Sequence, residues 1–256
     1  MSLVKTAKHS LRTVLEAAGY WVRHRSVLPF GIDYQLDIQR MADLMGIPVG
    51  TFFDIGAHTG ETSLDVLRKF PGVRIFAFEA HPTTFSVLIS NVHDARFDGF
   101  NIALSDKNGK AQFYEYGYLA TCNSLVGDNQ FAVQSKNPSK VLEVECQTLD
   151  GFCGAHGIEK IDVLKIDTEG HDLSVLRGAE QTLAARGVSF VYIEFNSMLP
   201  RPGTTGGALM PITAILEPLG FHFVASYPEC MITTGELLVT SNALFVRPPS
   251  RSAPHS

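Results

Sequence analysis

The chain has 256 residues, of which 45% are hydrophobic and 18% charged, so it can bury a sizeable core. Its net charge of -5 argues against a general nucleic-acid binder, because contacts with phosphates need clustered Lys and Arg. The four cysteines form no Cys-x-x-Cys pair and have no clustered His beside them, so neither a zinc site nor a disulfide framework is indicated. We therefore expect a cytoplasmic protein that acts on small molecules.

Residues 1–47 are predicted to be an N-terminal helical extension. Basic residues such as Arg12 alternate there with apolar ones such as Leu11, without the unbroken apolar run of a signal peptide or membrane span. Such a helix can rest weakly on an anionic membrane surface, but we favour packing against the domain or a partner subunit of a homo-oligomer. The main domain then covers residues 48–248, and the polar, proline-rich residues 249–256 are predicted to be a disordered tail.

The next segment predicts a strand, a glycine turn, a helix and a second strand. Residues 49–53 and 73–78 are apolar runs typical of buried strands, and residues 61–70 have a helical pattern. In the turn, Gly56 and Gly60 let the backbone approach a ligand, and the helix directs its free N–H groups toward it. This unit is therefore the expected binding place of a nucleotide-like cofactor.

Two carboxylates decide which cofactor suits this turn. Glu79 follows the second strand, where a carboxylate can accept the hydroxyl groups of a ribose. Asp54 ends the first strand, in the spacing Asp-x-Gly-x-x-x-Gly rather than the Gly-x-Gly-x-x-Gly of dinucleotide-binding enzymes. A carboxylate beside the turn repels a pyrophosphate and suits a cation. We therefore favour S-adenosylmethionine, which has an ammonium, a sulfonium and no phosphate, over NAD.

The rest of the chain continues an α/β pattern. We predict a helix over residues 82–92, a third strand over 100–104, and added strands over 111–116 and 141–148. Between the added strands, residues 118–140 are polar and irregular, and they are a candidate substrate lid. The remaining predicted elements are a strand over 160–167, a helix over 170–186, a strand over 188–195, a helix over 210–219 and closing strands over 221–227 and 243–246.

A second group of polar residues follows the later strands. Asp167 and Glu194 lie at the carboxyl ends of apolar strands, the edge where open α/β sheets bind ligands. Asp167, Glu169, His171 and Asp172 crowd one turn, where they offer general bases for a hydroxyl or oxygen ligands for a divalent cation. Plainer roles stay open: Asp167 can cap the helix, Glu169 and Asp172 can favour its N-terminus, and His171 can be a solvated first-turn residue. Our candidate catalytic residues are Asp167, His171 and Glu194.

Segments along residues 49–196 together form a recognisable set. They are Phe53-Asp-Ile-Gly-Ala-His-Thr-Gly60, Phe78-Glu-Ala-His-Pro82, Asn101-Ile-Ala-Leu-Ser-Asp106, Asn123-Ser-Leu125, Gln147-Thr-Leu-Asp150 and the run from Leu164 to Ala179. This set resembles the successive motifs of the FkbM family of S-adenosylmethionine-dependent methyltransferases. The block Lys165-Ile-Asp-Thr-Glu-Gly170 is the most specific. The chain departs from the family at His58, where the family usually has Asn.

The resemblance implies a Rossmann-like class I methyltransferase fold, with a seven-stranded, mostly parallel sheet whose last strand is antiparallel. It also implies methyl transfer, usually to a hydroxyl oxygen of a sugar, a glycolipid or a natural product. The segment around Asp167 would close the methionine end of the cofactor and face the acceptor. The cofactor-binding residues that it implies are Asp54, Gly56, Ala57, His58, Thr59, Gly60, Glu79, Ala80, Asn101, Ala103 and Asp167.

Two other functions stay open on the residues alone. An NAD-dependent oxidoreductase would use the same Glu79 for its ribose, and a non-catalytic protein could keep the fold as a binding module. Within the methyltransferase interpretation, residues 118–140 and 196–203 are expected to shape the acceptor site.

Overall fold

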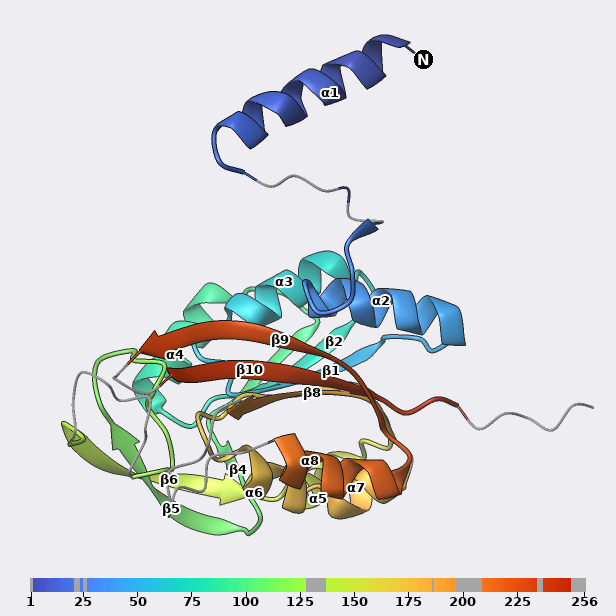
Figure 1. The fold of residues 1–256 in the computed structure, drawn as a ribbon. Helices are drawn as coiled ribbons and strands as arrows, with labels where there is room; N and C mark the ends of the chain where they lie inside the picture. Colours follow the sequence, from blue (N-terminus) through green and yellow to red (C-terminus); the bar gives the residue numbers. More distant parts are fainter. Residues whose placement is uncertain are drawn as a thin grey trace, which may run out of the picture.

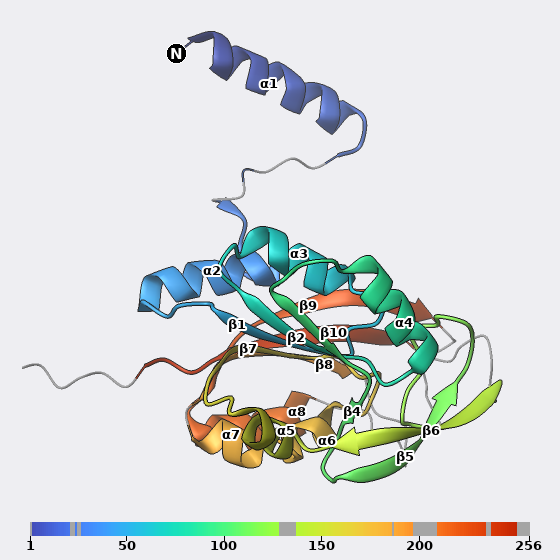
Figure 2. The ribbon, with the colours of Figure 1, turned by 180° about the vertical axis from the view of Figure 1, so that it is seen from behind.

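The computed structural model describes residues 2–20, 24, 27–127, 137–185, 187–196, 209–233 and 237–249. These residues form a seven-stranded sheet with helices on both faces, and a three-stranded sheet lies at one end of it (Figures 1 and 2). The predicted α/β class is confirmed.

The main sheet has the strand order β3-β2-β1-β7-β8-β10-β9. Its first five strands pair in parallel, whereas β10 runs antiparallel to both β8 and β9. The expected antiparallel last strand is therefore confirmed. The order reverses between β1 and β7, and ligands bind open parallel sheets at the carboxyl ends beside such a reversal. The strands are β3 (Phe97–Phe100), β2 (Arg74–Phe78), β1 (Thr51–Ile55), β7 (Ile161–Ile166), β8 (Val188–Asn196), β10 (Leu237–Val246) and β9 (His222–Thr233).

Two layers of helices cover the sheet because its central strands are apolar on both faces. All six residues of β7 are buried, and separate hydrophobic clusters fill the two sides of the sheet. One layer contains α2 (Tyr34–Met45), α3 (Glu61–Lys69) and α4 (Pro82–Asn91). The other contains α5 (Leu149–His156), α6 (Asp172–Arg177), α7 (Glu180–Ala184), α8 (Leu209–Leu216) and the 3-10 turn η2 (Glu217–Leu219).

Four predicted elements are wrong in their extent. The two closing strands are longer than predicted, since β9 covers His222–Thr233 and β10 covers Leu237–Val246. The third strand, predicted over residues 100–104, is two strands: β3 ends at Phe100, and β4 (Ala103–Leu104) belongs to the small sheet. The helix predicted over 170–186 is divided into α6 and α7 at Gly178. A Cβ on Gly178 would lie 1.9 Å from the Ser105 carbonyl oxygen, so the chain passes that loop too closely for any other residue.

The small sheet has the order β4-β6-β5, with β5 (Gly109–Glu115) and β6 (Lys140–Gln147) close to the predicted added strands. Its own hydrophobic cluster is small and contains Phe113 and Val144. The sequence analysis did not predict α5, although Thr148 caps its first turn by accepting from the Gly151 N–H.

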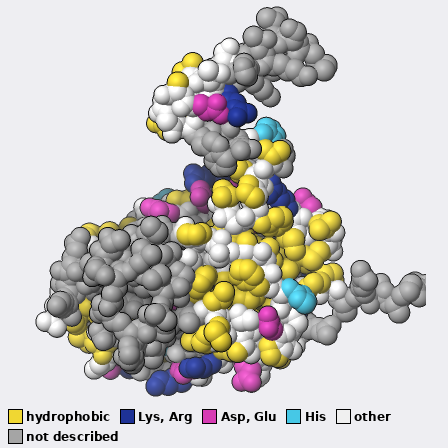
Figure 3. All heavy atoms as spheres, viewed as in Figure 1, with side chains coloured by type: hydrophobic (Ala, Val, Ile, Leu, Met, Phe, Trp, Pro, Cys, Tyr) yellow, Lys and Arg dark blue, Asp and Glu magenta, His cyan; other side chains and the backbone are white. Residues whose placement is uncertain are grey.

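The N-terminal helix α1 (Ser2–Ala17) stands away from the domain in both views (Figures 1 and 2). Packing against the domain is therefore wrong here, and packing against a partner subunit stays a prediction. No helix among the described residues is long and apolar enough to cross a membrane. On the face seen in Figure 3, hydrophobic side chains spread over β9 and α8, where Phe223 and Met210 are exposed. The predicted tail lies outside the described residues, apart from Pro249.

Candidate active site

A cavity of about 780 Å³, including its open mouth, lies at the carboxyl ends of β1, β2 and β7. The glycine turn, the end of β2, residues 102–104, the turn after β7 and part of the loop after β5 line it. The cavity is thus at the edge of the sheet that the strand order indicates.

The glycine turn is shaped by contacts that only glycine permits. Gly56 has a φ of 78°, and a Cβ there would lie 1.8 Å from the Asp167 carbonyl oxygen. Gly60 has a φ of 92°, and a Cβ there would lie 2.7 Å from the Val92 side chain on the C-terminal side of α4. Because of these close approaches, the turn lies directly against the segment that follows β7 at Gly56 and against the end of α4 at Gly60.

His58 also adopts the left-handed conformation, with a φ of 49°. Asn and His are both among the non-glycine residues that tolerate this region, so the departure from the family's Asn keeps the backbone of the turn. The His58 backbone N–H donates to Glu79 Oε2 at 3.0 Å. Its side chain adds a contact, because Nε2 lies 3.1 Å from the Leu119 carbonyl oxygen in the loop after β5.

Glu79 is the carboxylate at the centre of the cavity's cofactor side. It is 8% exposed and accepts from the His58 N–H at 3.0 Å and the His81 N–H at 2.8 Å. Burial raises the pKa of Glu79 to about 7, although the two backbone donors oppose this shift. A carboxylate offers about four lone-pair sites, so Glu79 can still accept hydroxyl donors from a ligand.

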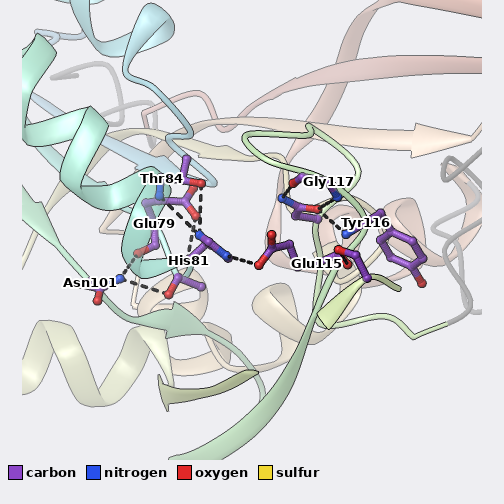
Figure 4. A network of polar contacts seen from close by, with 10 residues as sticks. Glu79, His81, Thr84, Asn101, Glu115, Tyr116 and Gly117 are labelled. Atoms are coloured by element: carbon purple, nitrogen blue, oxygen red, sulfur yellow. Dashed lines mark hydrogen bonds and ion pairs between the residues drawn. The ribbon is translucent and has the colours of Figure 1, made fainter. Parts of the chain in front are cut away.

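Further polar contacts hold Glu79 in place (Figure 4). The Asn101 side-chain N–H donates to the carbonyl oxygens of Glu79 at 2.8 Å and Ala80 at 3.0 Å. His81 accepts from the Thr84 N–H at the start of α4, and its Nε2 lies 3.1 Å from Glu115 Oε2 on β5. The cofactor side of the cavity is therefore tied to the small sheet.

A buried ammonium joins two carboxylates beside the glycine turn. Lys165 Nζ lies 3.1 Å from Asp54 Oδ1 and 3.3 Å from Asp167 Oδ2. It also donates to the Gly56 carbonyl oxygen at 3.3 Å. Burial alone would lower the pKa of Lys165, but attraction to the two carboxylates more than offsets burial and raises it. Asp54 is fully buried and also accepts from Ser63 Oγ at 2.7 Å.

The turn after β7 is held by Asp172. This buried carboxylate accepts from the Thr168 N–H and hydroxyl and from the Gly170 N–H. The bonds fix two successive left-handed residues, Glu169 with a φ of 55° and Gly170 with a φ of 96°. Burial raises the pKa of Asp172. Asp172 therefore has a structural role inside the turn, whereas Glu169 lines the cavity.

The comparison with protein families decides what kind of enzyme has this cavity. Residues 54–222 match the model of the methyltransferase FkbM domain. The chain belongs to the FkbM methyltransferase family. It is therefore a methyltransferase, and the oxidoreductase and the non-catalytic binding module are set aside.

Curated relatives are similar at low identity. The 2-O-methyltransferase NoeI of Sinorhizobium fredii is 26% identical over 220 residues, which cover 80% of this chain and 85% of NoeI. The 31-O-demethyl-FK506 methyltransferase FkbM of Streptomyces tacrolimicus is 26% identical, over 70% of this chain and 75% of that protein. The hexuronic acid methyltransferase AglP of Haloferax volcanii is 28% identical, over 57% of this chain and 55% of AglP.

His171 of this methyltransferase lines the cavity on the side of α6. Its Nε2 lies 2.9 Å from Ser105 Oγ, and that hydroxyl donates to Asp106 Oδ1 at 3.2 Å. Burial lowers the pKa of His171, so the imidazole is neutral at neutral pH and can accept a proton.

The predicted site residues fall into two groups. Those that line the cavity are Gly56, His58, Glu79, Ala80, Ala103, Asp167 and His171. Those outside the lining are Asp54, Ala57, Thr59, Gly60, Asn101 and Glu194. Glu194 lies near the end of β8, opposite Asn242 of β10, and is 7% exposed. Asp54 and Asn101 support the lining from behind through the contacts described above.

Sequence reasoning missed two parts of this methyltransferase site. Lys165 was quoted at the start of the most specific block but given no role, although a lysine inside a strand of buried apolar residues is a recognisable signal for a paired charge. Ser124 was quoted as part of a motif but given no role. Its hydroxyl reaches the carbonyl oxygens of Thr168 at 3.1 Å and Glu169 at 3.0 Å. It thereby fastens the described part of the predicted lid to the turn after β7.

The two segments predicted to shape the acceptor site are only partly described by the structure. Of the predicted lid, residues 118–127 are described, and residues 120–125 include five that line the cavity. Residues 128–136 lie outside the described residues, as do residues 197–203 of the second predicted acceptor segment. Within the described residues, no group of three or more His, Cys, Asp or Glu side chains is arranged to hold a metal ion.

Proposed function

We propose that this FkbM-family methyltransferase transfers a methyl group from S-adenosylmethionine to a hydroxyl oxygen of a sugar, glycolipid or natural product. The observation that carries the cofactor assignment is Glu79, a buried carboxylate at the end of β2 that faces the cavity. The names of the relatives support oxygen as the methylated atom, since NoeI is a 2-O-methyltransferase and FkbM acts on a 31-O-demethyl compound.

The residues present fit this cofactor. Glu79 has acceptor sites left for the two ribose hydroxyls, and the Gly56 turn leaves the space that a side chain would fill. Apolar lining by Ala80, Ile102 and Ala103 suits a flat adenine ring. Asp54 by itself attracts a cationic ligand less strongly than the sequence indicated, because Lys165 pairs with this carboxylate. Together Asp54, Lys165 and Asp167 carry a formal charge of −1, which still favours a cationic ligand.

S-Adenosylmethionine supplies a methyl group already activated on a sulfonium. The chain's part is to hold the acceptor in line with that methyl and to receive the hydroxyl proton. Asp167 and His171 both line the cavity, and each can accept a proton, the first at a carboxylate oxygen and the second at a ring nitrogen. We propose Asp167 as the proton acceptor, with His171 as the second candidate. Glu194 stays a prediction, since it does not line the cavity.

Calorimetric titration with S-adenosylhomocysteine tests the cofactor assignment. We expect micromolar binding to the wild type and a loss of about 10- to 100-fold in Glu79→Ala, because hydrogen bonds to a charged group contribute roughly 1.5–3 kcal/mol. Glu143→Ala is the matched control, since Glu143 is an exposed acid on β6 outside the cavity lining. Absence of binding to the wild type would contradict the proposal.

The acceptor class is tested by screening hydroxylated compounds with radiolabelled S-adenosylmethionine. Hexuronic acids and FK506-type compounds are chosen from the relatives' names, and neutral sugars and glycolipids complete the first panel. Transfer to oxygen in any of these classes, lost in Asp167→Asn, supports the proposal. Methylation that occurs at nitrogen or carbon instead would overturn it.

A further inference from the structure

Lys165 lies at the centre of the sheet and directly beside Asp54, its register partner across β1 and β7. The side chain is 5% exposed, and its ammonium meets Asp54 at 3.1 Å, Asp167 at 3.3 Å and the Gly56 carbonyl oxygen at 3.3 Å. An ammonium has three N–H donors, and three oxygen atoms surround this one. Lys165 therefore links the first strand, the cofactor turn and the proposed proton acceptor.

The charges require such a link. Asp54 is fully buried, and Asp167 is partly buried close to it. A fully buried carboxylate with a second carboxylate close to it is costly unless a cation compensates their charges. A divalent cation bridging two carboxylates is one solution. Here the ammonium already fills the position between the two carboxylate groups, and it is covalently part of the chain.

We propose that Lys165 takes the place of a divalent cation between Asp54 and Asp167. It is a positioning residue that compensates the charges of the two carboxylates and fixes Asp167 at the cavity wall, so that methyl transfer needs no added metal ion. This inference rests on the proposed function. In it, Lys165 replaces the divalent cation for which the sequence offered the acidic turn at Asp167 as a source of ligands.

The first experiment uses the wild-type protein saturated with S-adenosylhomocysteine and needs no acceptor. MnCl2 is titrated into this complex in a calorimeter, and we expect no saturable binding. Turnover with the acceptor found in the screen should be equal before and after treatment with a chelator. Saturable Mn²⁺ binding that Asp167→Asn abolishes, or turnover that a chelator stops and Mg²⁺ or Mn²⁺ restores, would overturn the inference.

The second experiment replaces the ammonium with an uncharged side chain of similar length, in Lys165→Met. Asp54 and Asp167 should then share a proton at neutral pH, and kcat should fall by about 100-fold through loss of the proton acceptor. Activity should partly recover as the pH rises, since higher pH removes that proton. Further ionisable groups face this cluster, namely Tyr34 and Glu79, and Asp172 faces Asp167.

The double variant Asp54→Asn/Lys165→Met separates charge from packing. It removes the like-charged neighbour of Asp167, so the extra pH dependence of Lys165→Met should disappear. A pH profile in Lys165→Met parallel to that of the wild type would contradict a positioning role. Thermal unfolding checks that each variant folds, and the Mn²⁺ titration decides if Lys165→Met does not. Failure of the proposed function can be distinguished from failure of this inference, because in the first case the wild type would bind no S-adenosylhomocysteine.

Discussion

One wall of the cavity belongs to the main sheet, and another belongs to the small sheet and the loop that follows β5. The sheet wall is held by the ion pairs that Lys165 forms with Asp54 and Asp167 and by glycines that permit no side chain. The loop wall is held by polar contacts from His58, His81 and Ser124. The difference indicates that the sheet wall sets cofactor binding, whereas the loop wall can vary with the acceptor.

The largest effect should come from breaking the sheet wall at Gly56. Gly56→Ala places a Cβ 1.8 Å from a backbone oxygen in a left-handed conformation, so we expect a loss of more than about 3 kcal/mol of stability and no cofactor binding. Gly157→Ala is the matched control, since Gly157 is also left-handed but has open space around it. Thermal unfolding compares the two. Equal losses in both variants would show that the close approach is unimportant.

Glu79 should make cofactor affinity depend on pH. Ribose hydroxyls donate to the ionised carboxylate, and the pKa of Glu79 in the free protein is about 7 because of burial. Affinity for S-adenosylhomocysteine should therefore rise about tenfold between pH 6 and pH 8, with release of a proton. Calorimetry in buffers of different ionisation enthalpy measures both effects. Glu79→Gln should bind more weakly and without this pH dependence, and a pH dependence that persists there would assign it to another group.

The same raised pKa affects folding stability. The folded protein holds the Glu79 proton more tightly than the unfolded chain, whose pKa is near the ordinary value of 4.5. The contribution of Glu79 to stability is therefore fully present below pH 4.5 and is lost as the pH rises to about 7. Urea unfolding of the wild type and Glu79→Gln at pH 5 and pH 8 checks this direction. A wild type that gains stability relative to the variant at pH 8 would contradict it.

The loop wall should respond more mildly and in a different parameter. Ser124→Ala removes the hydroxyl that reaches Thr168 and Glu169, which corresponds to about 1–3 kcal/mol for a buried contact. We expect the acceptor KM to rise about tenfold while affinity for S-adenosylhomocysteine changes little. Ser86→Ala is the control, because Ser86 bonds only within α4 at the surface among the described contacts. If Ser124→Ala weakened the binding of cofactor and acceptor equally, the two walls would not have separate roles in binding.

The smallest effect is expected at His58. His58→Asn keeps a residue that tolerates the left-handed turn and loses the contact with Leu119. Cofactor affinity should stay within about threefold, since a neutral hydrogen bond contributes roughly 0.5–1.5 kcal/mol. Amide hydrogen exchange in residues 117–125 should become faster. His58→Ala should cost more, because alanine strains the turn. If Asn and Ala behave alike, the backbone conformation is not what His58 provides.

Much of the fold could be predicted because its signals are local. The apolar strands, the glycine turn and the acidic ends of the strands depend on residues close in sequence, and they gave the α/β class, the place of Glu79 and the crowded turn at Asp167. The resemblance to a family supplied the number of strands in the main sheet and the antiparallel last strand.

The missed features depend on contacts between distant residues. The break at Gly178 arises from its approach to Ser105, and no local pattern reveals it. Residues 100–104 read as one apolar strand, yet Ala103 and Leu104 pair with β6 instead of continuing β3. Lys165 was given no role because Asp54, its partner in the adjacent strand, is 111 positions away. The period of a strand does not show which buried charges will meet.

The place of β10 in the sheet has a consequence for biosynthesis. This strand inserts between β8 and β9, so β8 has no neighbour on that side until residues 237–246 leave the ribosome. Its apolar residues Val191, Ile193 and Phe195 then border an open edge, and such edges pair readily with other chains. A nascent or truncated chain that ends before β10 should therefore depend on chaperones, whereas the finished sheet closes this edge with its own antiparallel strand.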